Sequence, residues 1–303
     1  MAKNTFSAGL YVAATPLGHL ADISDRVRDA LTQCDVIFAE DTRRAQTLLS
    51  ALGIGRSKSS IRSLHEYNEE AIQGEVLRAL EARQSVLLIS DAGTPAVSDP
   101  GALAVDAAWN HGYPISPLPG PSAVIAALSV CGFKRWPISF WGFAPAKSSA
   151  RKTWLEKIRN SGGIVVIFET PHRADESLHD CATVFGSHTP MLFAREMTKQ
   201  HETLLRSSIE QVTKKIMHQR EQDPGSAKGE MVWVFDLGDK KIESADVQQL
   251  RQFATVLASE MPASSAAKCL VKMLGVTRDA AYEAVLSAST AGSADQHNKY
   301  SDK

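Results

Sequence analysis

The sequence predicts an α/β protein built from two α/β domains and a small helical region at the C-terminal end. Short apolar runs alternate with longer amphipathic stretches, a pattern typical of mainly parallel sheets covered by helices on both faces. The length of 303 residues suggests about two domains at roughly 150 residues each. Hydrophobic residues make up 44% and charged residues 22%, which excludes a disordered, collagen-like or coiled-coil chain.

The first predicted domain comprises residues 1–133. Its expected strands are short apolar runs at 10–14, 36–39, 86–89 and 115–118. Amphipathic patterns predict helices at 25–31, 42–52 and 69–82, with further helices after 102 and after 122. In the helix at 69–82, Ile72, Val76 and Leu80 recur every fourth residue, which indicates one apolar helix face.

The second predicted domain comprises residues 134–240. Its expected strands lie at 138–143, 164–168, 191–194 and 231–235, and its expected helices at 151–160, 174–185 and 209–219. Residues 244–288 form the small helical region, with helices expected at 247–260, 263–274 and 278–286. Residues 289–303 are polar, and we expect a disordered tail there.

Charge and cysteine content restrict the function classes. The sum of 33 basic and 34 acidic residues is −1, which excludes a polycation that wraps nucleic acid. The four cysteines are far apart and form no C-x-x-C pair, so we expect neither a zinc ribbon nor a disulfide scaffold, and no metal. No apolar run approaches the ~20 residues that span a bilayer. We therefore expect a reduced, cytoplasmic protein without a membrane segment.

The most informative segments are loops rich in glycine, proline, serine and threonine that follow predicted strands. They lie at 14–18, 90–101 and 119–122. Each alone would be ordinary turn chemistry. Three such loops at strand ends indicate a ligand site, because open α/β sheets bind ligands outside the carboxyl ends of their strands. None of the three matches the dinucleotide, P-loop or nucleophile-elbow patterns.

Several of these segments resemble the tetrapyrrole methylase superfamily, namely residues 10–18, 39–43, 90–101 and 117–123. A narrower set is similar to the ribosomal RNA small subunit methyltransferase I branch of that superfamily, namely residues 65–69, 143–151, 168–173, 194–199 and 228–230. The resemblance covers about residues 9–237 and includes the helical region.

The resemblance implies transfer of a methyl group from S-adenosylmethionine to the ribose 2′-hydroxyl of a cytidine in the decoding region of 16S ribosomal RNA. It also implies a homodimer, and a cofactor cleft between the two α/β domains. The cofactor contacts implied in the first domain are Pro16, Asp91, Ala92, Gly93, Thr94, Ser98, Asp99, Pro119, Gly120, Pro121 and Ser122. Those implied in the second domain are Phe168, Glu169, Ala194 and Gly229.

Methyl transfer to a ribose hydroxyl is helped by a group that accepts the hydroxyl proton. Four side chains that follow consecutive strands of the first domain are candidates, and the sequence does not select one of them: Glu40, Asp41, His65 and Glu66. Each could instead cap a helix or pair with Arg43 or Arg44.

Contacts to RNA require positive charge. Basic residues gather at 147–159 around a single acidic residue, Glu156. The substrate contacts that we expect are Arg43, Lys147, Arg151, Arg173, Arg195 and Lys199. The alternative for the cluster at 147–159 is a solvated helix face. The partner implied is 16S ribosomal RNA, within the small ribosomal subunit.

Two other functions compete with this interpretation. One is a methyltransferase that acts on a tetrapyrrole or another small molecule, as elsewhere in the superfamily. The other is a non-catalytic RNA-binding or assembly factor that has kept a relict cofactor pocket. The segments 65–69 and 169–173 favour the ribosomal RNA enzyme over the first alternative, and the intact loops argue against the second.

Overall fold

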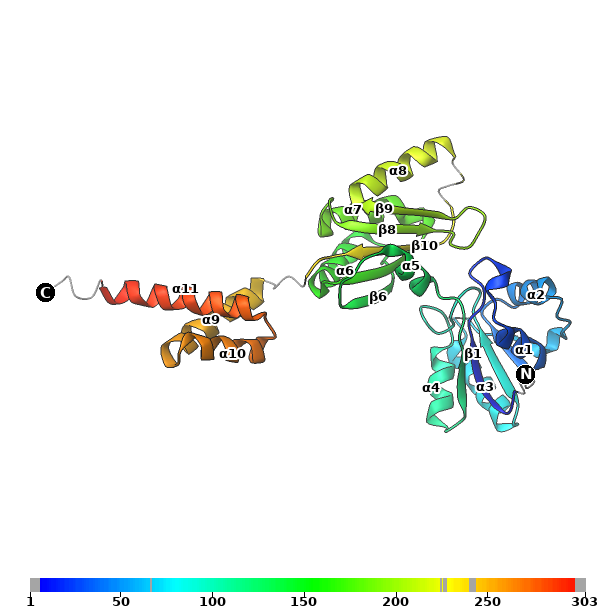
Figure 1. Ribbon diagram of the computed structural model, residues 1–303. Helices are drawn as coiled ribbons and strands as arrows, with labels where there is room; N and C mark the ends of the chain where they lie inside the picture. Colours follow the sequence, from blue (N-terminus) through cyan, green and yellow to red (C-terminus); the bar gives the residue numbers. More distant parts are fainter. Residues whose placement is uncertain (1–5, 66, 224, 226–227, 240–243, 298–303) are drawn as a thin grey trace. The chain divides into compact units, whose positions relative to one another are not determined.

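The computed structural model describes residues 6–65, 67–223, 225, 228–239 and 244–297 (Figure 1). The chain divides into two compact units. The first, which we call the α/β unit, comprises Met1–Glu156 and Gly163–Gly238, and it contains both sheets. The second, which we call the helical unit, comprises Lys157–Gly162 and Asp239–Lys303.

The first sheet has five parallel strands in the order β3-β2-β4-β1-β5. The strands are β1 (Gly9–Ala13), β2 (Val36–Ala39), β3 (Ile61–Ser63), β4 (Ser85–Ile89) and β5 (Ile115–Leu118). All five carboxyl ends therefore lie at one edge of the sheet, as the sequence predicts for the four strands that its apolar runs reveal. The sequence missed β3, because three residues are too few to form a recognisable apolar pattern.

Both faces of this sheet are covered by helices. The helices of this half are α1 (Asp25–Gln33), α2 (Thr42–Ala51), α3 (Glu69–Glu81) and α4 (Ala102–Asn110). Successive strand residues point to opposite faces. Ile37 and Leu87 therefore pack with α1 and α2, whereas Phe38 and Leu88 pack with α3 and α4.

The second sheet is mixed, with the order β6-β7-β10-β8-β9. Its strands are β6 (Ile138–Phe143), β7 (Ile164–Glu169), β8 (Pro190–Arg195), β9 (Thr203–Ser208) and β10 (Met231–Asp236). Only β6 and β7 are parallel, and β10 runs antiparallel to both of its neighbours. The sequence missed β9, an edge strand on which partly buried and exposed positions mix and apolar residues are few.

Helix α5 (Ala123–Cys131) follows the last strand of the first sheet but packs against the second sheet (Figure 1). Ala127 and Cys131 share a core with Val166 and Val234. The division between the two sheets therefore precedes α5, whereas the sequence placed the domain boundary at 133/134. The other helices of this half are α6 (Ser148–Ser161), α7 (Ala174–Phe185) and α8 (Ile209–Gln222).

The helical unit has a core of its own. Helices α9 (Ser244–Glu260), α10 (Ala263–Leu274) and α11 (Arg278–His297) pack around Leu250, Leu270 and Val285. Helix α11 extends to His297, so the tail expected from residue 289 begins within a helix. Alanines such as Ala291 and Ala294 favour continuation of a helix that has already started. Residues 298–303 of that expected tail lie outside the described residues. Within the described part of the chain, no helix is long and apolar enough to cross a membrane.

The four cysteines are free thiols. Cys34, Cys131 and Cys181 are buried, and Cys269 in α10 is partly exposed. Burial raises the pKa of the Cys34 thiol to about 12 and also raises the pKa of Cys181.

Candidate functional site

The three loops that the sequence singled out are joined to one another at the carboxyl edge of the first sheet. Thr15 after β1 and Gly93 after β4 exchange two backbone hydrogen bonds, of 2.8 and 3.0 Å. The buried hydroxyl of Thr15 donates to the carbonyl of Ser90 over 3.1 Å. The hydroxyl of Thr94 donates to the carbonyl of Pro121 over 3.1 Å, which ties in the loop after β5.

The loop after β4 is held in an unusual backbone conformation. Gly93 and Gly101 have φ angles of +80° and +123°, and two residues with side chains, Ala96 and Ser98, have φ angles of +64° and +62°. Positive φ at residues other than glycine costs energy, on the order of 1–3 kcal/mol each, and such residues cluster at functional sites. At Gly93 a Cβ atom would lie 3.2 Å from Leu17 Cδ2, so a side chain there would also be crowded.

A cavity of about 400 Å³ lies beside this loop, within the size range of small-molecule sites. It is lined by Leu17, Glu40, Arg44, Asp91, Ala92, Gly93, Thr94, Val97, Asp99, Ser122, Ala123, Val124, Phe143, Phe168, Glu169, Thr170, Pro171, Glu230, Met231 and Val232. Residues from both sheets of the α/β unit therefore contribute to it. A smaller cavity of about 50 Å³ shares Arg44 and Asp91 with the larger one and includes Pro16 and Asp41 in its lining.

The larger cavity is acidic. The carboxylates in its lining are Glu40, Asp91, Asp99, Glu169 and Glu230. Asp91, Glu169 and Glu230 each have a cationic partner, namely Arg44, Arg173 and Lys199. Burial, followed by the charge of Glu40, raises the pKa of Asp99 to about 7. Burial also raises the pKa values of Glu40 and Asp91. Such a lining favours a ligand that carries positive charge, because a cation relieves the repulsion between the carboxylates.

The structure distinguishes the three proposed proton acceptors that lie within the described residues. Glu40 lines the larger cavity, and its Oε2 accepts the N–H of Asp91 over 3.3 Å. Asp41 caps α2 through the N–H of Arg43 and binds the Arg43 guanidinium, and these contacts hold its pKa well below the usual range. His65 follows β3 but lines neither cavity. Glu66 lies outside the described residues.

Eight of the predicted cofactor residues line the larger cavity: Asp91, Ala92, Gly93, Thr94, Asp99, Ser122, Phe168 and Glu169. Pro16 lines the smaller one. Six others are absent from the lining of both: Ser98, Pro119, Gly120, Pro121, Ala194 and Gly229. The side chain of Ala194 points into the core of the second sheet. Gly229, with φ +105°, lies against Glu196, where a Cβ atom would be only 2.4 Å from Cγ.

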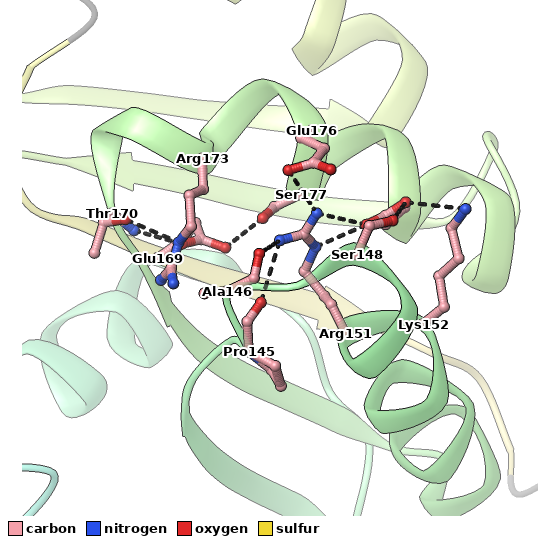
Figure 2. A network of polar contacts seen from close by, with 11 residues as sticks. Pro145, Ala146, Ser148, Arg151, Lys152, Glu169, Thr170, Arg173, Glu176 and Ser177 are labelled. Atoms are coloured by element: carbon pink, nitrogen blue, oxygen red, sulfur yellow. Dashed lines mark hydrogen bonds and ion pairs between the residues drawn. The ribbon is translucent and has the colours of Figure 1, made fainter.

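Two of the predicted RNA contacts are corrected by the structure. The Arg151 side chain is completely buried and binds Asp180, Glu176 and two backbone carbonyls (Figure 2). Arg195 is 8% exposed and donates to the carbonyls of Lys228 and His201. Both side chains use their hydrogen bonds inside the protein, so neither is available to a phosphate.

The other four predicted RNA contacts differ in how firmly they are held. Arg173 binds Glu169, and Lys199 binds Glu196 and Glu230. Arg43 is exposed but lies in a two-point contact with Asp41, at 3.1 and 2.7 Å. Lys147 is exposed just before α6.

Among the lining residues of the larger cavity that the sequence did not single out as site residues, three carry a charged or aromatic side chain. Arg44 lies one residue beyond the segment 39–43, which contains Arg43, and Phe143 begins the segment 143–151, in which the sequence analysis gives roles only to Lys147 and Arg151. Glu230 reaches the cavity because β10 starts where β7 ends, with Met231 opposite Glu169. An acidic residue next to the Lys228-Gly229 pair was visible in the sequence, but the antiparallel pairing that brings it to the site was not.

Comparisons with known proteins agree with this geometry. The family model for tetrapyrrole (corrin/porphyrin) methylases matches residues 9–213. The chain is 38% identical to ribosomal RNA small subunit methyltransferase I of Xylella fastidiosa (strain Temecula1), over 90% of this chain and 97% of the relative. It is 35% identical to the protein of that name in Escherichia coli O157:H7, over 91% and 94%.

Solved structures share the fold at low sequence identity. Diphthine synthase gives a TM-score of 0.56 at 17% identity, over 80% of this chain and 94% of that one. Uroporphyrin-III C-methyltransferase from Thermus thermophilus, complexed with S-adenosyl homocysteine, gives a TM-score of 0.51 at 15% identity, over 76% and 97%.

Proposed function

The chain belongs to the tetrapyrrole (corrin/porphyrin) methylase family and to its ribosomal RNA small subunit methyltransferase I members, and we propose that it methylates the ribose 2′-hydroxyl of a cytidine in the decoding region of 16S ribosomal RNA, with S-adenosylmethionine as methyl donor. The observation that carries the proposal is an acidic cavity formed by the motif loops of a chain this similar to ribosomal RNA methyltransferases.

The cavity fits the proposed donor in size and charge. S-adenosylmethionine carries a sulfonium and an ammonium group, and the carboxylates of Glu40, Asp91, Asp99 and Glu230 supply complementary negative charge. The apolar part of the lining, with Phe143, Phe168 and Val232, offers surface for a flat adenine ring. When bound, the donor supplies an electrophilic methyl group with a good leaving group, so the reaction depends chiefly on positioning.

Within this proposal, Glu40 accepts the proton of the attacking hydroxyl. Of the three sequence candidates that lie within the described residues, Glu40 alone lines the larger cavity, and burial raises its pKa, which makes it a better proton acceptor. The new C–O bond forms as the C–S bond breaks, the sulfur keeps the electron pair, and the hydroxyl proton passes to a carboxylate oxygen of Glu40. The Asp91 N–H, 3.3 Å from Oε2, holds this carboxylate in place.

We propose Arg44 and Lys147 as contacts to the RNA phosphates. Arg44 lies at the cavity with 64% of its side chain exposed, and it has one carboxylate partner, Asp91, at 3.2 Å among the contacts of the described residues. Arg43 lies next to it in the chain but forms an ion pair with Asp41. We therefore assign the phosphate contact to Arg44 in place of Arg43.

The remaining parts of the proposal concern the assembly. We propose that the two α/β domains, predicted as residues 1–133 and 134–240 and divided in the structure before α5, hold the donor between them. We also propose that residues 244–288 form a separate helical domain, and that the enzyme acts as a homodimer on the small ribosomal subunit. A ribosomal substrate also implies a cytoplasmic location.

The test is to map ribose methylation in 16S ribosomal RNA from strains with and without the gene, and to restore it with the purified protein. Small subunits from the deletion strain are incubated with the protein and radiolabelled S-adenosylmethionine. We expect label at one cytidine of the decoding region. Label in a corrinoid precursor and none in RNA would support the small-molecule enzyme instead. Absence of S-adenosylmethionine binding by calorimetry would support a non-catalytic RNA-binding factor.

A further inference from the structure

The second sheet contributes two aromatic rings to the cavity wall, and each ring lies close to the loop that follows its strand. Phe143 ends β6 and Phe168 lies near the end of β7, with their ring centroids 5.2 Å apart in an edge-to-face contact. Phe143 is 52% exposed, so packing alone does not hold it. The loops that follow the two strands therefore decide where this wall lies.

The loop after β6 is held by Arg151. Its Nη1 donates to the carbonyls of Pro145 and Ala146, each at 3.2 Å, and its Nε donates to Asp180 over 2.8 Å (Figure 2). The Asp180 carboxylate also accepts the hydroxyl of Ser148. Burial alone would raise the pKa of Asp180, but the hydrogen bonds from Arg151 and Ser148 outweigh burial and hold it below its ordinary value. Asp180 is therefore an anion that fixes the direction of the Arg151 fork.

The loop after β7 is held by Glu169, which is 1% exposed. Its Oε1 accepts the N–H of Thr170 over 2.7 Å and the guanidinium of Arg173 over 2.9 and 3.2 Å. Its Oε2 accepts the hydroxyl of Ser177. Thr170 and Pro171, which this arrangement fixes, line the cavity directly.

Both sets of contacts end on the same helix. Ser177 binds Glu169 and Glu176 binds Arg151 (Figure 2). Asp180 also binds Arg151, and all three residues lie on α7 within about one turn of each other. We propose that α7 is a common anchor for the two loops that form this wall of the cavity, and that Arg151 is a positioning residue for methyl-donor binding rather than an RNA contact. This inference rests on the proposed function.

The test compares Arg151→Lys and Arg151→Met with Arg56→Met. Lysine keeps a charge near Asp180, but it cannot donate to Asp180 and to two carbonyls in the same fixed fork. Arg56 is the matched control, because its guanidinium also donates to backbone carbonyls, those of Leu31, Cys34 and Asp35, but lines neither cavity. Because Arg151→Met leaves the buried Asp180 carboxylate with the half-exposed Lys152, 3.3 Å away, in place of its buried partner, the double variant Arg151→Met/Asp180→Leu removes both buried charges.

The readouts are the melting temperature, the Kd for S-adenosylmethionine by calorimetry well below that temperature, and kcat and KM on deletion-strain small subunits. We expect all Arg151 variants to weaken donor binding by roughly tenfold or more and to lower kcat/KM on the order of 100-fold, because a small misplacement of a site is costly. The double variant should do so even where its melting temperature recovers. Arg56→Met should lower only the melting temperature.

Two results would overturn the inference. One is a folded Arg151→Met/Asp180→Leu protein with the wild-type Kd for the donor. The other is a weaker salt dependence of RNA binding in Arg151→Met with unchanged donor binding, which would mark Arg151 as a phosphate contact. If the wild-type protein itself does not bind S-adenosylmethionine, the proposed function fails instead, and the two failures are thereby distinguished.

Discussion

The Arg44 guanidinium lies 3.2 Å from Oδ2 of Asp91, and these two residues line both cavities. Oδ1 of the same carboxylate accepts the N–H of Asp41 over 3.1 Å, so the pair also links the ends of β2 and β4. Among the described residues that line the larger cavity, Arg44 carries the one positive side chain, against several carboxylates. Within the proposed function, Arg44 is the cation of this cavity that we assign to an RNA phosphate.

The first prediction concerns this arginine. Arg44→Met should weaken RNA binding and reduce the slope of log affinity against log salt concentration by roughly 0.7–0.9, the amount expected for one phosphate contact. Binding of S-adenosylmethionine should be kept or strengthened, because the cavity becomes more negative. Filter binding at several salt concentrations measures the slope. Arg43→Met is the control and should leave the slope unchanged, since Asp41 holds that side chain.

The second prediction concerns pH. Because the pKa of Asp99 is raised to about 7, its carboxyl loses charge as the pH falls through 7, and the affinity for the sulfonium cation should fall with it. Calorimetry between pH 5.5 and 8.5 should show affinity rising toward about pH 7 and then levelling off. Asp99→Asn should flatten this profile, although Glu40, Asp91, Glu230 and Arg44 remain around it. An unchanged profile in Asp99→Asn would assign the titration to another group.

The raised pKa of Asp99 also affects folding stability, which should fall as the pH rises, whereas donor affinity should rise. Between the ordinary value of 3.8 and about 7, the unfolded chain has lost the Asp99 proton while the folded chain keeps it. The contribution of this group to stability is therefore full at low pH and declines as the pH rises through that window. Urea unfolding at pH 5 and pH 7, compared between the wild type and Asp99→Asn, measures the difference.

The third prediction separates binding from chemistry at Glu40. Glu40→Gln keeps the shape and an acceptor for the Asp91 N–H but removes the proton acceptor, so kcat should fall on the order of 100-fold. The Kd for S-adenosylmethionine should rise much less than this. Asp41→Asn serves as the control, because asparagine also caps helices well. A kcat in Glu40→Gln equal to that of the wild type would remove Glu40 from the proposed mechanism.

The fourth prediction concerns the loop after β4. Gly93→Val should abolish donor binding, because a β-branched side chain at φ +80° is strained and crowds Leu17 at the cavity. Gly53→Val is the matched control. Gly53 has a φ of +69° but open space around it, so this variant carries the backbone strain alone, about 1–2 kcal/mol. Normal calorimetric binding by Gly93→Val would place the donor elsewhere.

The loops of the candidate site could be predicted because glycine and proline mark them in the sequence and because parallel strands end at one edge. The contribution of β10 in the second sheet could not be predicted. This strand runs antiparallel to β7, so its amino end lies beside the carboxyl end of β7. No apolar pattern encodes the direction of a strand. Glu230 therefore entered the site only when the sheet topology was known.

The burial of Arg151 could have been predicted from helical spacing in the sequence, but the basic residues around it favoured a different interpretation. Arg151 is spaced four and seven residues from Leu155 and Ile158, which places all three on one helix face, and all three are buried. The surrounding positive charge suggested an RNA surface instead. Arg195 is buried for a different reason, because every residue of β8 from Met191 onward is buried and Arg195 ends that run. For Arg151, helical periodicity thus predicts the side on which the charged residue lies better than local charge does.

The distribution of thiols has a practical consequence. Thiolates, not thiols, react with alkylating reagents, and burial suppresses both ionisation and access. Three of the four cysteines are buried, and Cys269 on α10 is partly exposed. A maleimide dye should therefore attach to the native protein at this one position without any substitution. Time-resolved anisotropy of that dye would then follow the tumbling of the helical unit, and RNA added to the sample would show whether this unit joins the complex.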